Sequence, residues 1–142
     1  MKVSARNVFH GKVGALTPGA VNAEVEVVLA GGERLVAIIT MASVRTLGIA
    51  AGGEVVALVK APWVMLMTDA SGVRLSARNC LAGTVKSVTP GAVNAEVVLT
   101  LAGGAEVAAI VTKEAVGELG LKPGVAATAV IKASHVILGV RA

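Results

Sequence analysis

The stretch Ser4–Val25 reads SARNVFHGKVGALTPGAVNAEV, and it returns at Ser76–Val97 as SARNCLAGTVKSVTPGAVNAEV. The correspondence continues without a gap to Thr68 in the first copy and Val140 in the second, at a constant offset of 72 residues. A repeat of this length indicates a tandem duplication in which each copy is one structural unit. We therefore predict two modules, residues 1–69 and residues 70–142, which meet at a short polar stretch, residues 68–72.

Each copy has the pattern of a mainly β module. Val21–Leu29 alternates between apolar and polar side chains, and Gly31-Gly32 supplies a hairpin turn after it. Met41, Val44 and Leu47 follow a helical period, with Thr40 as the N-cap and Gly48 as the residue that ends the helix. The strands predicted for the first copy are Asn7–Leu16, Val21–Leu29, Arg34–Ile39, Glu54–Lys60 and Val64–Met67.

This order of elements predicts the fold class. Five strands with one helix between the third and the fourth suit a small OB-like barrel. We expect a mainly β protein of two tandem OB-like five-stranded barrels, each with one short helix and each closed by its own last strand, Val64–Met67 in the first copy. Several strands are apolar on both faces, which is typical of strands buried in an assembly.

Composition excludes several classes of protein. Hydrophobic residues make up 55% of the 142 residues and charged residues 15%, which excludes a disordered chain. A membrane-spanning helix needs about 20 nearly uninterrupted apolar residues, and the clean run after Lys60 ends at Met67. The first residues lack the apolar core of a signal peptide, so we expect a cytoplasmic protein. The single Cys80 excludes an intrachain disulfide, and we expect it to be a small core residue.

The two copies act as a control on each other, because a side chain with a shared role is retained in both. Most charges have diverged and read as solvated surface; Glu33 faces Ala105 in the other copy, and Arg34 faces Glu106. The retained charged positions are Arg6/Arg78, Glu24/Glu96 and Lys60/Lys132. The retained neutral polar positions include Ser4/Ser76, Asn7/Asn79, Thr17/Thr89, Asn22/Asn94 and Thr40/Thr112.

The retained side chains form a set of hydrogen-bond donors. Arginine, lysine and hydroxyl groups together suit a small oxyanion that only accepts hydrogen bonds. Arg6 and Lys60 converge if the first and the last strands of a module pair, or if they meet across subunits. The retained cations also fit structural salt bridges with Glu24 and Glu96, and the sequence leaves both interpretations open. A structural arginine has a fixed carboxylate partner, whereas an arginine that waits for a ligand lacks one.

Four segments, in the same order in both copies, carry a family resemblance. SARN, TPGAVNAEV, AIIT followed by ASVRTLGI, and LVKAPWVML together resemble the molybdenum-pterin-binding (Mop) domain, or molbindin. The arrangement of two such modules and little else is similar to di-Mop molybdate-binding proteins. The resemblance implies OB-like barrels that bind molybdate or tungstate as the oxyanion, with no catalytic cofactor, in a homotrimer. It implies a cytoplasmic role in molybdenum storage, buffering or homeostasis.

The resemblance also implies which residues bind the oxyanion. In the first copy they are Ser4, Arg6, Thr40, Ser43, Lys60 and Ala61. In the second copy they are Ser76, Arg78, Thr112, Lys132 and Ala133, where Ala115 replaces the second hydroxyl. The family has a second class of site on the threefold axis, which we assign to two turns with backbone N–H groups, formed by Gly19, Ala20, Val21 and Asn22 and by Gly91, Ala92, Val93 and Asn94.

Other functions fit the sequence less well. An OB module that binds nucleic acid needs aromatic stacking platforms and a basic groove, but the aromatics Phe9 and Trp63 are Leu81 and His135 in the other copy. A homo-oligomer without a ligand is a further alternative. We expect no enzyme, because neither histidine recurs and no Cys/His cluster has metal-ligand spacing. No helix-turn-helix pattern is present, so we do not expect a complete transcription regulator or a nucleic-acid or membrane partner.

Overall fold

The computed structural model describes residues 1–69 and 71–142, and it confirms the mainly β fold class. The first copy contains β1 (Asn7–Pro18), β2 (Asn22–Leu29), β3 (Arg34–Thr40), α1 (Met41–Leu47), β4 (Glu54–Val59), the 3₁₀ turn η1 (Ala61–Trp63) and β5 (Met65–Met67). The second contains β6 (Asn79–Pro90), β7 (Asn94–Leu101), β8 (Glu106–Thr112), α2 (Lys113–Leu119), β9 (Ala126–Ile131), η2 (Ala133–His135) and β10 (Ile137–Gly139). Ala70, in the predicted joining stretch, lies outside the described residues.

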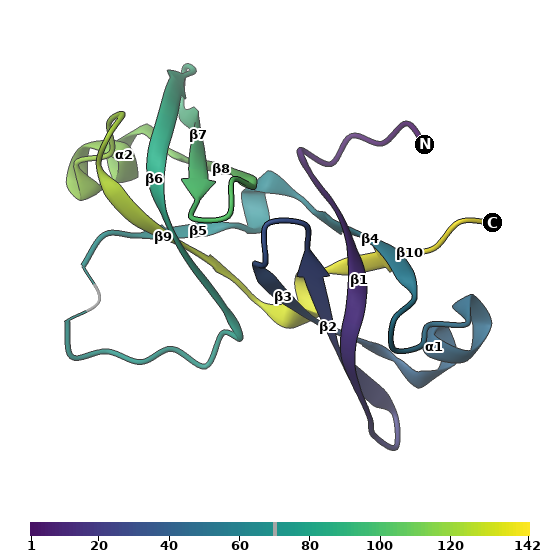
Figure 1. Ribbon diagram of the computed structural model, residues 1–142. Helices are drawn as coiled ribbons and strands as arrows, with labels where there is room; N and C mark the ends of the chain where they lie inside the picture. Colours follow the sequence, from purple (N-terminus) through teal and green to yellow (C-terminus); the bar gives the residue numbers. More distant parts are fainter. Residues whose placement is uncertain (70) are drawn as a thin grey trace.

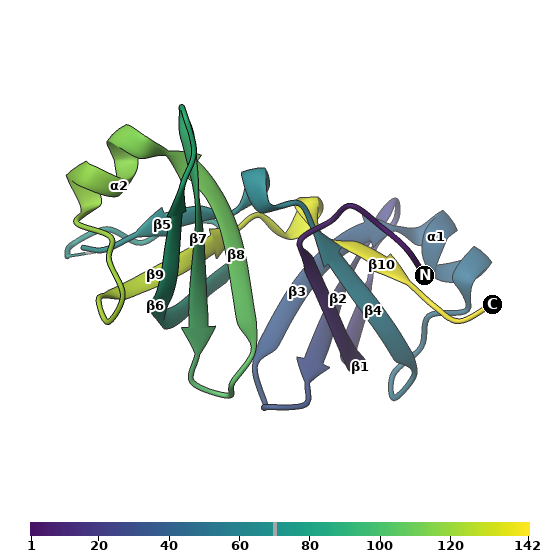
Figure 2. The ribbon, with the colours of Figure 1, turned by 90° about the horizontal axis from the view of Figure 1, so that it is seen from above.

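The strands form two five-stranded antiparallel sheets that lie side by side, with α1 and α2 at opposite outer ends of the molecule (Figure 2). The strand orders are β10-β4-β1-β2-β3 and β5-β9-β6-β7-β8. In both sheets the long first strand contains an irregularity, after Val13 in β1 and after Val85 in β6. The two sheets are therefore built alike, as the duplication predicts.

Each sheet takes its fifth strand from the other copy, an exchange that the sequence pattern does not predict. β10 pairs with β4, with Ile137 opposite Leu58, and β5 pairs with β9, with Met65 opposite Val130. The expectation that Val64–Met67 closes its own sheet is wrong, because η1 packs against β8 and carries the chain across to the other sheet. Figure 1 shows β10 crossing to lie beside β4. Each sheet therefore contains four strands from one sequence repeat and one strand from the other.

Alternating side chains build the core of each sheet. Ala23, Val25, Val27 and Leu29 of β2 are buried, and the intervening side chains are partly exposed. The alternation predicted for this strand is confirmed from Ala23 onward, but Val21 is 73% exposed because it precedes the strand in the turn. Removing such apolar surface from water contributes about 25 cal/mol per Å², so this periodicity sets which face of the sheet is inside.

Both helices have the ends that the sequence predicts. The Thr40 side chain caps α1 by accepting a hydrogen bond from the Ser43 N–H, and Gly48 ends the helix with a φ of 64°, in the left-handed region. Thr112 and Gly120 do the same for α2. Glycine is favoured at such a position because it has no Cβ to clash. No helix in the described ranges is long and apolar enough to cross a membrane.

The two hairpin turns that follow β2 and β7 touch each other. An added Cβ at Gly31 would lie 2.2 Å from the Gly103 carbonyl oxygen, so only glycine fits this approach. Glu33 joins the same contact, because its Oε2 accepts a hydrogen bond from the Ala105 N–H at 3.2 Å and its Oε1 is buried. The expectation that Glu33 is solvated surface is therefore wrong. Figure 2 shows both turns at the same side of the molecule.

One other sequence-based expectation needs correction. Cys80 is exposed, because it lies one residue after the buried Asn79 and so on the opposite face of β6. Arg34 and Glu106 are exposed, as expected for solvated surface, and each has a local partner: Arg34 pairs with Glu26 and Glu106 pairs with Lys86, each at 2.5 Å.

Candidate functional site

The pairing of β1 with β4 brings the retained cations of each copy to one place. Asn7 lies opposite Val59, so Arg6, just before β1, and Lys60, just after β4, extend from the same end of neighbouring strands. In the second sheet Asn79 lies opposite Ile131, which places Arg78 and Lys132 in the same way. The two cations thus converge in both sheets, but through pairing of the first strand of each copy with its fourth strand and not with its last.

The retained asparagines fix this end of each sheet against the other sheet. Asn7 is 2% exposed; its Nδ2 donates to the Ala108 carbonyl oxygen at 2.8 Å, and the Ala108 N–H donates to its Oδ1 at 2.7 Å. Asn79 makes the same two bonds, of 2.8 and 2.7 Å, with the backbone of Val36. The amide acts as one more strand residue on the edge of β8 or β3. The retention of both asparagines in the sequence is a signal for a shared role, but it does not by itself reveal the contact with the other sheet.

Each retained arginine pairs with the retained glutamate of the other copy. The Arg6 guanidinium holds the Glu96 carboxylate through two contacts, of 2.8 and 2.6 Å. Arg78 Nη1 lies 2.5 Å from Glu24 Oε2. The hydrogen bond that Arg78 donates to Glu24, and then the negative charge of Glu24, raise the pKa of Arg78 above its usual value. Glu24 and Glu96 are therefore retained as arginine partners.

By the criterion set from the sequence, both arginines behave as structural residues in the single chain. Their side chains are nevertheless about half exposed, at 57% for Arg6 and 50% for Arg78. Exposed ion pairs stabilise a fold by only about 0–1 kcal/mol, and a guanidinium carries five N–H donors. An arginine held by one carboxylate in this way still has N–H groups for a second anion.

The lysines differ from the arginines in having no carboxylate partner in the described part of the chain. Both are exposed, and each precedes a 3₁₀ turn whose first residue, Ala61 or Ala133, is buried. Lys60 Nζ lies 5.5 Å from the centroid of the Trp63 ring. Because η1 packs against β8 and η2 against β3, each lysine–alanine pair adjoins the edge strand of the opposite sheet.

The hydroxyl groups of the two copies are arranged differently. Thr40 Oγ1 donates to Ser43 Oγ at 2.9 Å, in addition to its capping bond. Thr112 accepts the equivalent N–H bond from Ala115 at 3.0 Å, but no second hydroxyl is present at that position. Ser4 and Ser76 are exposed in the segments that lead into β1 and β6. The two copies therefore offer unequal donor sets.

The turns assigned to a second class of site lie beside the starts of the helices. The Met41 N–H donates to the Val21 carbonyl oxygen at 2.8 Å, and the Lys113 N–H donates to that of Val93 at 2.9 Å. The N–H groups of Gly19 and Gly91 donate within their own turns, at 2.9 and 2.8 Å. Those two donors are occupied, so an anion at these turns would have to use the other backbone N–H groups.

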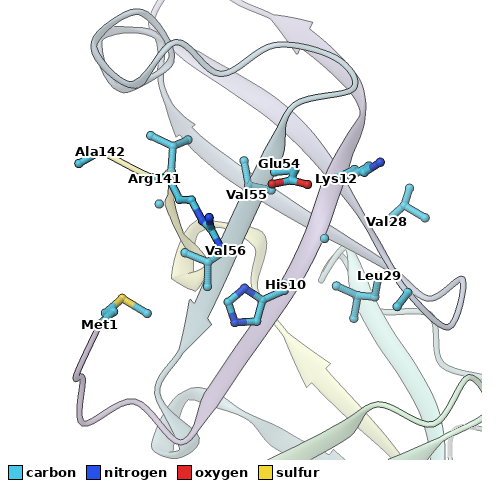
Figure 3. Close-up of a pocket in the computed structure, with 14 residues that line it drawn as sticks. Met1, His10, Lys12, Val28, Leu29, Glu54, Val55, Val56, Arg141 and Ala142 are labelled. Atoms are coloured by element: carbon cyan, nitrogen blue, oxygen red, sulfur yellow. The ribbon is translucent and has the colours of Figure 1, made fainter.

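A groove of about 1000 Å³ lies elsewhere, on β1, β4 and β10 (Figure 3). Its polar side chains include His10, Lys12, Glu54 and Arg141, which have no equivalent side chain in the other copy, and none of the predicted oxyanion residues lines it. The groove is therefore separate from the site that the duplication retained. Within residues 1–69 and 71–142 no cluster of three or more His, Cys, Asp or Glu side chains could hold a metal ion.

Comparison with known families identifies the repeated module. The TOBE domain matches residues 3–66 and residues 75–138. The chain belongs to the TOBE domain family. The resemblance noted from SARN and the other three segments is confirmed, and both TOBE repeats contain a retained arginine, asparagine and lysine.

Relatives of this TOBE protein carry molybdenum-related names. The chain is 47% identical over 138 residues to the molybdenum-pterin-binding protein MopA of Rhodobacter capsulatus, a match that covers 97% of this chain and 52% of that protein. It is 48% identical over 140 residues to the molybdenum transport protein ModE of Azotobacter vinelandii, covering 99% and 52%. The chain thus spans about half the length of these two curated relatives.

One similar structure covers the whole chain. It is the cytoplasmic molybdate-binding protein ModG with molybdate bound, at 67% identity and a TM-score of 0.96, over 99% of this chain and 100% of that one. A likeness of this extent includes both sheets and the strand exchange between them. The two TOBE repeats are therefore arranged here as they are in ModG.

Proposed function

We propose that this protein binds molybdate as an intact oxyanion and serves in the storage, buffering or homeostasis of molybdenum, without catalysing a reaction. The observation that carries the proposal is the full-length likeness to ModG, at 67% identity. The retained donors supply the chemistry, because arginine, lysine and hydroxyl groups all donate to an anion that can only accept. Tungstate has the same charge and tetrahedral shape, and we propose it as a second ligand.

Arg6 and Lys60 lie at one end of their sheet, whereas Thr40 lies opposite Asn22 at the other end, so these residues do not meet within one sheet. The proposed binding residues are those predicted from the sequence. In the first copy they are Ser4, Arg6, Thr40, Ser43, Lys60 and Ala61, and in the second Ser76, Arg78, Thr112, Lys132 and Ala133. A fixed set of hydrogen-bond donors favours a large dianion over phosphate. Phosphate carries a proton near neutral pH, so its O–H group would face the N–H and O–H donors of the protein without an acceptor. Sulfate lacks that proton, so its exclusion depends on the size of the cage.

We propose that the cage is completed between copies of the chain in a homotrimer. The donors are exposed in the single chain, and equivalent apolar side chains in the two repeats are exposed as well. Val21 and Val93 are 73% and 72% exposed, and Met65 and Ile137 are 59% and 54% exposed. Large apolar side chains that recur at equivalent exposed positions indicate a surface that is covered by a partner. The turns 19–22 and 91–94 contain two of them, which supports a second oxyanion site where copies meet.

The nucleic-acid alternative loses support from the positions of the two aromatic residues. Phe9 is 7% exposed in the core, and Trp63 is stacked on His135 with 4.9 Å between ring centroids. Phe9 therefore offers no platform for a base, and the 39% exposed Trp63 is a single ring that already packs on His135. The cytoplasm is the compartment that we propose, because ModG is described as cytoplasmic.

Calorimetric titration tests the proposal. Molybdate added to the purified protein should bind, whereas sulfate and phosphate at the same concentrations should give no saturable heat. Equal binding of all three anions would contradict the proposed selectivity. No binding of molybdate or tungstate would contradict the function, and would favour a homo-oligomer without a ligand.

A further inference from the structure

The two lysines of the proposed site are each followed, three residues later, by a different ring-bearing residue, Trp63 after Lys60 and His135 after Lys132. The Trp63 N–H donates to the Lys60 carbonyl oxygen at 3.0 Å, and this turn places the indole beside the ammonium group, with Nζ 5.5 Å from the ring centroid. The His135 N–H makes the equivalent bond to Lys132 at 2.9 Å. The backbone turn is therefore the same in both copies, and Trp63 of the first copy is His135 in the second.

The indole of Trp63 is itself held in place by the other copy. Its ring lies 4.9 Å from the ring of His135, at an angle of 32° between the planes. His135 is partly buried, and its Nδ1 is buried without a hydrogen-bond partner. The pair joins the ends of η1 and η2, so a movement of the indole would disturb the packing between the sheets. Trp63 thus presents a fixed π-face to a lysine that lacks a carboxylate partner in the described residues.

A fixed ring next to a free ammonium group affects how the lysine binds an anion. Lysine loses much side-chain conformational freedom when its ammonium group is held at one point. A cation is attracted to an indole face within about 6 Å, and tryptophan is the best aromatic side chain for this contact. An ammonium group already restricted by the ring loses less freedom when the anion arrives, and such preorganisation increases affinity.

We propose that Trp63 positions the Lys60 ammonium group for the oxyanion. The sites built around Lys60 then bind molybdate more tightly than the sites built around Lys132, where histidine replaces the indole. This inference rests on the proposed function, and it names Trp63 as a positioning residue that does not itself need to touch the anion.

The matched variant is Trp63→His, because the same turn already accepts histidine at position 135. Loss of a cation–π contact at an exposed site should weaken binding at one class of site by about two- to fivefold. Trp63→Phe should lose less, since phenylalanine keeps a π-face. Calorimetric titration of the full chain should show two affinities for molybdate in the wild type, and the two should approach each other in Trp63→His.

Fluorescence gives a readout that a merely structural role would not change. Trp63 is the only tryptophan in the sequence, so its emission reports on this site. Molybdate should change the emission of the wild type and of Lys132→Met, but not that of Lys60→Met. If the wild type binds molybdate and Trp63→His binds it with unchanged affinities, the positioning role is wrong although the function stands. If the wild type binds no molybdate, the proposed function itself fails.

Discussion

Arg6 and Arg78 have the features both of a structural ion pair and of a ligand-binding site. Each arginine pairs with a carboxylate of the other repeat, and each stays about half exposed. The sequence could show that Arg6, Glu24 and Lys60 recur in the second copy. It could not show which charges pair, because each ion pair joins one copy to the other. An oxyanion at Arg6 has to share the guanidinium with Glu96. The structural and the ligand-binding interpretations therefore predict different effects of a substitution at Glu96 on anion affinity.

Replacement of Arg6 or Lys60 tests the proposed donors. Each hydrogen bond to a charged group contributes about 1.5–3 kcal/mol, so Arg6→Ala and Lys60→Ala should each weaken molybdate binding by about ten- to a hundredfold. Both side chains are exposed, so both variants should stay folded. Lys12→Ala serves as the control, because Lys12 is exposed on β1 and diverges between the copies. Normal binding in both variants would show that the site is misassigned.

Glu96→Gln separates the two roles of Arg6. The substitution removes a negative charge close to the incoming dianion, so molybdate binding should become severalfold tighter. An arginine that serves only the ion pair would leave the affinity unchanged in Glu96→Gln and in Arg6→Ala alike. Calorimetric titration of both variants at one ionic strength distinguishes these results.

At the scale of elements, the periodicity of each strand and the ends of each helix could be predicted, because they depend on local sequence. The caps Thr40 and Gly48, the turn at Gly31 and the buried alternation of β2 are all present. The exchange of β5 and β10 could not be predicted. Both strands carry the same apolar pattern and follow the same turn, so their sequence fits the edge of either sheet.

Asn7 should contribute strongly to stability through its contact with β8. Asn7→Ala removes both bonds to Ala108 and leaves a backbone N–H and a carbonyl without partners, which should lower the free energy of unfolding by about 2–4 kcal/mol. Urea denaturation measures the loss, with Thr84→Ala on an exposed position of β6 as the control. An unchanged midpoint in Asn7→Ala would contradict the role of the amide as a link between sheets.

Two glycines should respond to alanine in opposite directions. Gly31→Ala should destabilise the protein, because the new Cβ would lie 2.2 Å from the Gly103 carbonyl oxygen. Gly117 lies in α2 with no neighbouring atom in reach of a Cβ, so Gly117→Ala should stabilise the fold by about 0.5–1 kcal/mol. Thermal unfolding of the two variants should move in opposite directions, and a stabilised Gly31→Ala would show that the turns do not touch.

The strand exchange makes a prediction about local stability. Deletion of residues 137–142 removes β10 and exposes the edge of β4, although β4 lies in the first copy. Hydrogen exchange should then become faster at Val56–Leu58 and stay slow in β9, which pairs with β5. Faster exchange in β9 with β4 unchanged would mean that each copy closes its own sheet.

At the scale of the whole molecule, the two sheets form one body that is tied by exchanged strands, crossed ion pairs and reciprocal asparagines. These contacts place the retained donors of each copy next to an edge strand of the other. The duplication made the donor set visible in the sequence, because it retained Arg6 and Lys60 while other charges diverged. The duplication could not show that Glu96 forms an ion pair with Arg6 in the single chain, since that contact depends on how the two sheets pack.

Native mass spectrometry with molybdate tests the central claim most directly, because one spectrum gives both the assembly and the number of bound anions. We predict a trimer that gains several molybdate ions and gains none from equal concentrations of sulfate or phosphate. A monomer, or an oligomer whose mass does not change with molybdate, would contradict the account and leave Arg6 with Glu96 as its only anionic partner.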